Sequence, residues 1–400
     1  MSERVFIVAA YRTPIGKFGG LLRDFTPNDL AAELFTKLFE KTGVAPADID
    51  QVHLGCCTHC AANEGVAPII ARQALLKAGI PYTALSSTVD RACTSGTYAI
   101  KTGFDAIRLG EADVVIAGGT EVLSRTPYLD RSTRYGSRIG PVTLTDPLFP
   151  LTYLEYAPVA VDAGNVALEY GVTRAMQDEW AYGSQMKYQA AKAAGKWQDE
   201  ILPVTIKSKK GDVILREDEF PKADTTLESL AKLPNVFGSA TVTAGNAPGL
   251  NDGATALILV SESRLKSLNL PAMAEIIGFE FVGGKPDRIA EVPGFSIRGL
   301  LGKHQLGLDD IECIEINEAF AAMPLVSSLV LAEGDTAKLA AIRSKINVNG
   351  GSVAIGHPVG ITGARIVVTL LHELRRRGGG YGVAAICGGL AQGDSLLIKV

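Results

Sequence analysis

The chain repeats near its C-terminus a pattern of residues that first occurs near its N-terminus. Residues 48–50 (DID) and residues 310–312 (DIE) each precede an apolar, strand-like run. A loop, a helical pattern, a buried strand and a Gly-Gly pair follow each run in the same order, with the pairs at 118–119 and 388–389. The loop residues Cys93 and His357 lie at closely similar distances after the two runs. This repetition predicts an internal duplication, in which two similar halves meet and bring equivalent loop-to-helix turns together.

Strand-like and helix-like patterns alternate within each half. Ile100, Phe104 and Ile107 fall on one face of a helix, and residues 112–117 form a continuous apolar run typical of a buried strand. Strands that alternate with helices indicate a mainly parallel, layered α/β fold. A stretch rich in Pro and Tyr, without clear periodicity, interrupts this pattern between residues 125 and 158.

These changes of pattern divide the chain into three parts. The N-terminal half takes residues 1–121 and returns at 245–270. An inserted loop domain over 122–244 holds the irregular stretch and a long helix that Thr173 caps. The C-terminal half takes residues 271–400. We therefore expect a duplicated α/β fold with an inserted loop domain.

Composition bounds the class of protein. With 400 residues, 47% of them hydrophobic, the chain can bury a large core, and its length suggests two or three domains. A net charge of −4 and dispersed basic residues give no indication of a nucleic acid partner. No apolar run reaches the ~18 residues of a membrane span, and the first residues lack the design of a signal or transit peptide. Six cysteines in a chain this long do not form a disulfide scaffold, so we expect a cytoplasmic protein.

Cys93 lies between a turn-prone segment and a helical pattern, which places it at or next to a helix N-terminus. Unpaired N–H groups and the positive end of the helix dipole favour a thiolate there. The small residues Ser95 and Gly96 allow another backbone to approach. A buried structural cysteine is the ordinary alternative, but this placement favours a nucleophile.

His357 lies in a glycine-rich loop, residues 349–360 (NGGSVAIGHPVG), between a Gly and a Pro. A histidine held in this way could deprotonate a thiol or donate a hydrogen bond to a developing oxyanion. A structural histidine is the alternative, and the glycine frame favours the functional interpretation.

Two further motifs follow buried strands in the C-terminal half. Residues 384–389 (AAICGG) carry Cys387 into a glycine turn whose free N–H groups could form an oxyanion hole. Taken alone, this cysteine would be a packing residue. Asn317 and Glu318 place an amide and a carboxylate just past a strand end, where active-site residues of α/β folds commonly lie.

Two loops invite ligand hypotheses. Residues 245–253 (GNAPGLNDG) form a tight loop of small residues that would let a ligand pass close to the backbone. Residues 56–60 (CCTHC) hold soft metal ligands, but no second Cys/His pair follows at the spacing of a zinc site. We therefore expect no metal there, and interpret these residues as packing near the interface or as a reactive surface thiol.

Taken together, these motifs resemble those of the thiolase family. Six motifs occur in the family's order over nearly the whole chain: RTPIGKFGG at 12–20, CTSG at 93–96, GNAPGLNDG at 245–253, NEAF at 317–320, GHPVG at 356–360 and CGG at 387–389. Each is weak alone, but the ordered set is specific. The resemblance implies a layered α-β-α-β-α fold. It also implies an acyltransferase that cleaves a 3-ketoacyl-CoA with coenzyme A or runs the reverse Claisen condensation with acetyl-CoA.

The resemblance implies a role for each site residue. Cys93 would carry the acyl group after activation by His357, and Cys387 would move the proton to or from the α-carbon of acetyl-CoA. Asn317, through a water, and His357 would hold the enolate oxygen. The backbone N–H groups of Cys93 and Gly389 would hold the oxyanion of the acyl-enzyme step.

Coenzyme A is implied as a substrate, with no permanently bound cofactor. The inserted domain would bind it, with Lys222 or the lysines within 207–210 near its phosphates, and Ala247, Pro248 and Gly249 of the 245–253 loop would also contact it. Family members are dimers or tetramers, so the resemblance also implies a homo-oligomer.

The chain departs from the family pattern at three places. The residue three before the nucleophile, often Asn, is Asp90, and a usual serine of the 245–253 loop is Pro248. A usual His-Met pair aligns with Pro158 and Val159. Because Val is shorter and stiffer than Met, this last change predicts room for an acyl chain longer or more branched than acetoacetyl.

Two alternative functions share this fold. A ketoacyl synthase-like condensing enzyme has the duplicated fold and the nucleophile, but it typically pairs Cys with two His, or with His and Asn. A non-catalytic acyl-CoA binding protein would tolerate loss of site residues. The second cysteine, Cys387, argues against the first alternative, and the intact set of Cys93, His357, Cys387 and Asn317 argues against the second.

Overall fold

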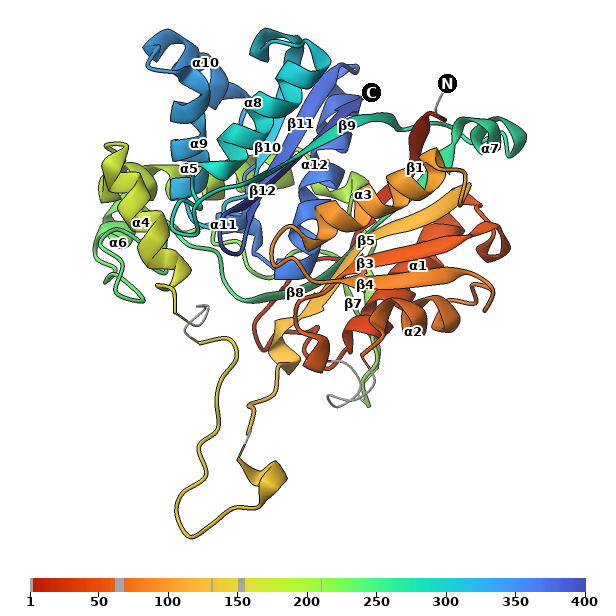
Figure 1. The fold of residues 1–400 in the computed structure, drawn as a ribbon, viewed down its shortest axis with the longest axis horizontal. Coiled ribbons are helices and arrows are strands. Elements are labelled where there is room, and N and C mark those ends of the chain that lie inside the picture. The colour runs from red at the N-terminus through yellow and green to blue at the C-terminus, as the bar shows by residue number, and fades with distance from the viewer. Residues whose placement is uncertain (1–2, 62–67, 131, 150–154, 210) are drawn as a thin grey trace.

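The computed structural model describes residues 3–61, 68–130, 132–149, 155–209 and 211–400 (Figure 1). The strands are β1 (Val5–Arg12), β2 (Gly16–Lys17), β3 (Gln51–Gly55), β4 (Leu85–Val89), β5 (Val114–Val122), β6 (Val204–Ile206), β7 (Val213–Leu215), β8 (Asn251–Ser261), β9 (Ala274–Gly283), β10 (Ile311–Ile316), β11 (Tyr381–Gly388) and β12 (Gln392–Lys399). The helices are α1 (Pro27–Thr42), α2 (Ile70–Lys77), α3 (Ser95–Arg108), α4 (Val159–Glu169), α5 (Arg174–Ala193), α6 (Leu227–Ala231), α7 (Glu262–Ser267), α8 (Val292–His304), α9 (Ala322–Ala332), α10 (Thr336–Lys345), α11 (Ser352–Ile355) and α12 (Thr362–Arg377).

A mixed sheet runs through the molecule in the order β10-β11-β12-β9-β1-β8-β5-β3-β4. Neighbouring strands are parallel at β3–β4, β3–β5 and β10–β11, and antiparallel at β5–β8, β1–β8, β1–β9, β9–β12 and β11–β12. The prediction of a mainly parallel sheet is therefore wrong. A tight turn can join only antiparallel neighbours, and β12 follows β11 through the short turn 389–391.

The buried strands separate three apolar cores, which gives the five layers α-β-α-β-α. In β5, Val114 and Ile116 face α1 and α2, while Val115 and Ala117 face α3 and α12. The strand β11 alternates in the same way between the central core and a core that includes residues of α8 and α9. Both faces of each half of the sheet are thus covered by helices, as the continuous apolar runs require.

The two central helices, α3 and α12, lie side by side and come from equivalent places in the two halves. Short 3₁₀ helices, η1 (Pro46–Asp48) and η7 (Leu308–Asp310), precede β3 and β10 in the same equivalent way. The predicted duplication is confirmed. The sheet nevertheless continues across the boundary between the halves, because β1 pairs with β9.

The region between the halves packs against both of them. The helix α4 contacts α9, and α5 contacts α11, while the hairpin β6–β7 lies against α1, where Lys37 Nζ donates to the carbonyl oxygen of Pro203. The described residues of the segments 126–130 and 132–149 project as an arm from the body (Figure 1), with Tyr135 91% exposed. The strands β6 and β7 pair antiparallel, and Lys210 between them lies outside the described residues. The proposed boundaries at 121, 244 and 270 stay a prediction.

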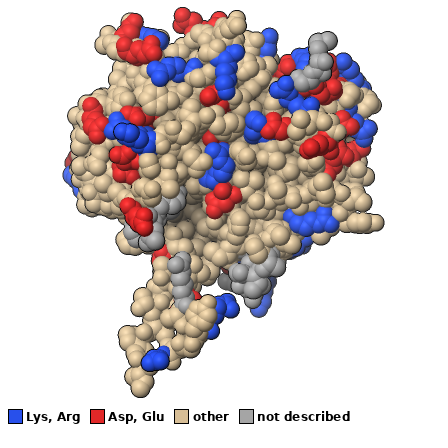
Figure 2. Space-filling model, viewed as in Figure 1, with Lys and Arg blue, Asp and Glu red and all other residues tan. Residues whose placement is uncertain are grey.

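Charges of both signs are interspersed on the face shown in Figure 2, and no single-sign patch dominates it. The projecting arm presents few charges on this face. In the described part of the chain, no helix is both long and apolar enough to cross a membrane.

Candidate active site

The structure brings Cys93 and His357 together where the N-terminal ends of α3 and α12 meet. Cys93 lies two residues before α3 and His357 five residues before α12. The Sγ atom of Cys93 lies 3.1 Å from Nε2 of His357. The two halves of the duplication therefore contribute one residue each to a thiol–imidazole pair.

The tautomer of His357 follows from the contacts of Thr362. The Thr362 hydroxyl donates its only proton to the carbonyl oxygen of Pro358, at 3.0 Å. Its oxygen can therefore only accept from His357 Nδ1, which lies 2.8 Å away. With the ring proton on Nδ1, the lone pair of Nε2 faces the Cys93 thiol and can accept its proton.

Burial keeps this pair neutral in the resting site. It raises the pKa of Cys93 to about 12, and it lowers the pKa of His357 to about 3 with a smaller contribution from Arg365. The prediction of a resting thiolate is therefore wrong, because desolvation outweighs the stabilisation that a helix N-terminus provides. A neutral imidazole beside a thiol is the protonation state that a general base requires.

The turn before Cys93 is held by its own side chains. Ala92 adopts a left-handed conformation with φ of 51°, and the Ser95 hydroxyl donates to the carbonyl oxygen of Ala92 at 2.6 Å. The carboxylate of Asp90 accepts from the N–H of Ala92 at 3.0 Å, so Asp in place of the usual Asn still caps this turn. The prediction that small residues admit another backbone is confirmed, since a Cβ on Gly96 would lie 2.7 Å from the backbone N of Ala364.

Cys387 and Gly389 approach the same turn from β11. A Cβ on Gly388 would lie 2.8 Å from the Thr94 side chain, so this hairpin packs directly against the residue that follows Cys93. Cys387 is fully buried, and burial, with a smaller contribution from Cys93, holds the pKa of its thiol well above the usual value. The N–H of Gly389 has no acceptor among the described residues.

Asn317 completes the set with an oriented amide. Its Oδ1 accepts from the Ser352 hydroxyl at 2.6 Å, and the Ser352 oxygen accepts from Arg365 Nη2 at 2.8 Å. Since Oδ1 is an acceptor here, Nδ2 is the free end of the amide. It is buried and has no partner among the described residues, so it can donate to a bridging water or a ligand.

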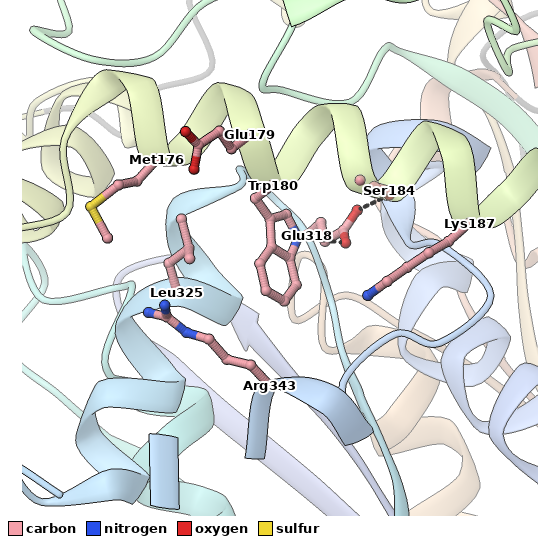
Figure 3. Close-up of a pocket in the computed structure, with 9 residues that line it drawn as sticks. Met176, Glu179, Trp180, Ser184, Lys187, Glu318, Leu325 and Arg343 are labelled. Carbon is pink, nitrogen blue, oxygen red and sulfur yellow. Dashed lines mark hydrogen bonds between the residues drawn. The ribbon is translucent and has the colours of Figure 1, made fainter. Parts of the chain in front are cut away.

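Glu318 is buried, but it anchors rather than reacts (Figure 3). Its oxygens accept from Trp180 Nε1 and Ser184 Oγ at 2.8 Å each, from Asn347 Nδ2 at 2.9 Å and from the N–H of Val353 at 3.0 Å. The bonds from Trp180, Ser184 and Val353 tie α5 and the 349–360 loop to the strand end that carries Asn317. The carboxylate predicted at this position therefore fixes the neighbouring amide.

Three of the sequence motifs converge on the backbone of His357. Asn251 Oδ1 accepts from the N–H of His357 at 3.0 Å, and its Nδ2 donates to the carbonyl oxygen of Gly16 at 2.9 Å. A Cβ on Gly356, which has φ of 109°, would lie 2.5 Å from Asn251 Cγ. The 12–20 and 245–253 loops thus support the catalytic loop in addition to any contact with a ligand.

The 56–60 segment is organised by a buried carboxylate. Glu121 accepts from the N–H groups of Cys57, Thr58 and Gly360, at 3.0, 2.9 and 2.8 Å, and from the Thr58 hydroxyl. The thiol of Cys56 also donates to it, at 3.6 Å. Within the described ranges no group of three or more His, Cys, Asp or Glu could hold a metal ion. The packing interpretation of this segment therefore fits its contacts.

Two of the four predicted coenzyme A contacts share a cavity. Lys222 and Ala247 line a cavity of about 240 Å³ between α5, α6 and the 245–253 loop. Pro248 and Gly249 lie outside its lining, and Gly249 packs against Phe220 instead. The lysines at 207 and 209 belong to the β6–β7 hairpin, on the far side of the molecule from α6 (Figure 1).

Val159, the first residue of α4, borders the apolar core that contains Cys387 and Met323. Its side chain is partly buried, and Pro158 precedes it as the N-cap residue. The segment aligned with the family's His-Met pair therefore lies against the same core as the second cysteine.

Sequence reasoning did not single out several residues that hold the site. Thr362, Asn251, Ser352 and Glu121 each orient a residue or loop named above. Thr362 carried a signal, because it stands two residues beyond the 356–360 motif, a little more than one turn after His357. Glu121 lies more than sixty residues from the loop it holds, so no local pattern could reveal it.

Comparison with known proteins matches almost the whole chain to one family. Residues 5–263 match the family model described as thiolase, N-terminal domain, and residues 270–400 match thiolase, C-terminal domain. The chain is 41% identical to beta-ketoadipyl-CoA thiolase of Pseudomonas aeruginosa over 100% of both chains. It is 40% identical to human mitochondrial 3-ketoacyl-CoA thiolase, covering 99% of this chain and 98% of the relative.

Solved structures of similar proteins have the same fold. The acetyl-CoA acetyltransferase of Bacillus anthracis superposes with a TM-score of 0.92 at 39% identity, covering 100% of this chain and 99% of that one. Human mitochondrial 3-ketoacyl-CoA thiolase in complex with CoA gives a TM-score of 0.91 at 39% identity, covering 99% and 98%. Two family models that together span almost the whole chain, in order, show that the chain belongs to the thiolase family.

Proposed function

We propose that this thiolase works through an acyl-enzyme on Cys93, with His357 as its base and Cys387 as the acid/base at the α-carbon. The observation that carries the proposal is the 3.1 Å contact between Cys93 Sγ and a neutral His357 Nε2 whose ring proton Thr362 fixes on Nδ1. Splitting the reaction into two thioester steps makes each one easier.

In the first step, Cys93 Sγ attacks the keto carbonyl of a 3-ketoacyl-CoA as its proton passes to His357 Nε2. The bond between the α- and β-carbons breaks, and acetyl-CoA leaves as an enolate, which takes a proton at its α-carbon from the Cys387 thiol. The free Nδ2 of Asn317 supports its role toward the enolate oxygen, through a water. The N–H groups of Cys93 and Gly389 stabilise the oxyanion of the attacked carbonyl.

In the second step, coenzyme A takes up the acyl group. Its thiol gives a proton to the Cys387 thiolate left by the first step and attacks the acyl carbonyl. The bond to Cys93 Sγ breaks, and this sulfur recovers its proton from His357. Every group then returns to its resting protonation state, and the reverse sequence gives the condensation with acetyl-CoA.

Coenzyme A as the substrate is supported by the cavity next to the 245–253 loop. Lys222 contributes a positive charge to the lining of this cavity, and Ala247 and Gly245 are small residues of the same lining. A relative with this fold has been solved in complex with CoA. The relatives are named for different substrates, acetyl, 3-ketoacyl and beta-ketoadipyl, so the acyl group that this chain accepts depends on its own pocket.

We also infer a cytoplasmic homo-oligomer that handles fatty acyl substrates. The edge strand β4 supports self-association, because Leu85 there is 66% exposed and Tyr82 before it is also exposed. The exposed arm, with Tyr128 and Ile139, offers a further apolar contact surface. An unprotected edge strand is a template for pairing with a second chain.

Acyl transfer to single cysteines tests the proposal. Brief incubation with [1-¹⁴C]acetyl-CoA, followed by mass analysis of peptides, should find the acetyl group on Cys93. Cys93→Ala should lose both acyl transfer and thiolysis. Cys387→Ala should still acquire the acetyl group but lose thiolysis by ~10²- to 10⁴-fold, the usual effect of removing one positioned acid/base.

Cys60→Ala provides the matched control, because Cys60 is a partly exposed thiol whose burial raises its pKa, outside the proposed machinery. It should retain thiolysis. Label on Cys56, Cys57 or Cys60 instead of Cys93 would refute the acyl-enzyme assignment. An equal loss of acyl transfer in the two catalytic cysteine variants would refute the division of their roles. Absence of any acyl transfer would favour the non-catalytic binding protein.

A further inference from the structure

The turn that carries Gly389 is strained. Leu390 and Ala391, which follow it, have φ of 57° and 58°, a left-handed conformation that residues with a Cβ rarely adopt. Two such residues in a row persist only where surrounding contacts impose them. The position of Gly389 is therefore set by what holds this turn from outside.

One side chain holds the turn directly. Gln392, the first residue of β12, lies opposite Gly388 in the β11–β12 register. Its Nε2 donates to the carbonyl oxygen of Gly389 at 3.3 Å. That carbonyl belongs to the residue whose N–H faces the proposed oxyanion, so a shift of Gln392 would move both ends of Gly389.

Gln392 is held in turn by Arg91, two residues before the nucleophile. Gln392 Oε1 accepts from Arg91 Nη2 at 2.8 Å and from Arg91 Nε at 3.2 Å. Because Oε1 takes both donors, the amide can only present Nε2 to Gly389. The two N–H donors of Arg91 thus orient the Gln392 amide, and this amide positions the turn.

The guanidinium of Arg91 is itself fixed on three sides. Its Nη1 donates to Asp394 Oδ2 at 2.8 Å, and the Asp394 carboxylate is fully buried. Its Cζ lies over the ring of Tyr98, 4.5 Å from the ring centre, and over that of Phe281, at 5.5 Å. A planar group held by a buried carboxylate and aromatic faces has little freedom to shift.

We propose that Arg91 and Gln392 are positioning residues that set the Gly389 N–H opposite the Cys93 turn, and so build the oxyanion hole across the two halves of the molecule. The proposal rests on the acyl-enzyme function proposed above. Arg91 belongs to the nucleophile turn of the first half, and Gln392 and Gly389 to the hairpin of the second. The chain of contacts from Arg91 through Gln392 to Gly389 therefore fixes the donor relative to the nucleophile.

The test compares two reactions of the same thiol. Acetylation by acetyl-CoA develops an oxyanion, whereas alkylation by iodoacetamide displaces iodide from a saturated carbon and develops none. A misplaced Gly389 N–H should slow the first reaction and spare the second. The ratio of the two rate constants at Cys93, each followed by mass spectrometry, reports the oxyanion hole.

Two substitutions separate the contacts of Gln392. Gln392→Glu keeps an acceptor for Arg91 but loses the donor to Gly389, while Gln392→Met loses both and keeps the volume. Each should lower the ratio by about 10-fold, less than the ~10²–10³-fold for deletion of an oxyanion donor. Arg91→Lys, which cannot form the two-donor contact with Gln392, should also lower it. Gln198→Glu makes the same charge change at an exposed site and should leave the ratio unchanged.

The outcomes are distinct. Failure of the proposed function shows in the wild type, as no acetylation of Cys93. With a wild type that acetylates, an unchanged ratio in Gln392→Glu and Gln392→Met overturns the positioning role alone. A lower ratio in Gln392→Met with an unchanged ratio in Gln392→Glu also overturns it, because the contact with Arg91, and not the hydrogen bond to Gly389, would then control the ratio. An equal fall of both reactions would mean general damage and likewise refute the proposal, and thermal unfolding measures that damage separately.

Discussion

Replacing Thr362 with valine should disable the base without changing its position. Thr362 Oγ1 is the acceptor for His357 Nδ1, at 2.8 Å, and valine has nearly the same shape but no acceptor. The N–H at Nδ1 would then be buried without a partner, which costs about 1–3 kcal/mol. The neutral ring avoids this cost by moving its proton to Nε2, where it faces Cys93 Sγ.

A ring in that second tautomer cannot accept the thiol proton. Because 1.36 kcal/mol corresponds to a factor of ten, a cost of about 1–3 kcal/mol leaves roughly one molecule in five to one in 150 with Nε2 free. The rate constant for acetylation of Cys93 should fall by the same factor, about 5- to 150-fold. Rapid-quench measurement with acetyl-CoA in a single turnover gives this rate constant directly.

Two variants control for other effects. Thr362→Ser keeps the hydroxyl and should acetylate within about 2-fold of the wild type. Thr369→Val removes another buried hydroxyl of α12, which donates to Glu200 Oε1 at 3.3 Å, and it should leave the acetylation rate unchanged. If Thr362→Val acetylates as fast as Thr362→Ser, the tautomer argument is wrong.

Two further predictions follow from the pocket and from the buried acids. Val159→Met should lower kcat/KM for a medium-chain 3-ketoacyl-CoA relative to acetoacetyl-CoA, because one methylene in an apolar pocket changes the discrimination between substrates by ~1–3 kcal/mol. A wild type that prefers acetoacetyl-CoA, with the ratio of the two kcat/KM values unchanged in Val159→Met, would contradict this prediction. Burial raises the pKa of Asp394 to about 7 and of Glu315 to about 8, so the folded chain keeps protons that the unfolded chain has already released. The free energy of unfolding in urea should therefore fall as pH rises from about 5 to 8, by at most ~1.4 kcal/mol per pH unit for each group. The fall should be less steep below pH 7 in Asp394→Asn, and an unchanged slope in that variant would show that Asp394 does not titrate in this range.

The pairing of Cys93 with His357 was predictable because the duplication put both residues in equivalent turns. Their protonation states were not. The sequence places Cys93 near a helix N-terminus, which stabilises a thiolate. The desolvation that opposes this stabilisation depends on the other half of the molecule. Burial at the junction of two halves raised the pKa of Cys93 and lowered that of His357.

The direction of the strands and the role of the 56–60 segment were also beyond local pattern. An apolar run predicts a buried strand, but it carries no information on which strand lies beside it or in which direction. The antiparallel returns through β8, β9 and β12 depend on those partners. The spacing at 56–60 argued against a metal and for packing, but it could not identify Glu121, far along the chain, as the acceptor for the N–H groups of Cys57 and Thr58.

The duplication gives the site its geometry through one crossing of helices. Residues 95–97 (SGT) open α3, and residues 362–364 (TGA) open α12 in the equivalent place. A Cβ on Gly363 would lie 2.3 Å from Thr97 Oγ1, just as one on Gly96 would meet Ala364, so each glycine admits the other helix.

Each helix also begins with a hydroxyl that folds back on the turn before it. The Ser95 hydroxyl donates to the carbonyl oxygen of Ala92 in the Cys93 turn, and the Thr362 hydroxyl donates to that of Pro358 in the His357 turn. The same type of local hydrogen bond thus occurs twice. In one turn it shapes the backbone around the nucleophile, and in the other it fixes the tautomer of the histidine. Because neither turn contains both reacting groups, the 3.1 Å contact between them exists only while the two glycines keep the helices in contact.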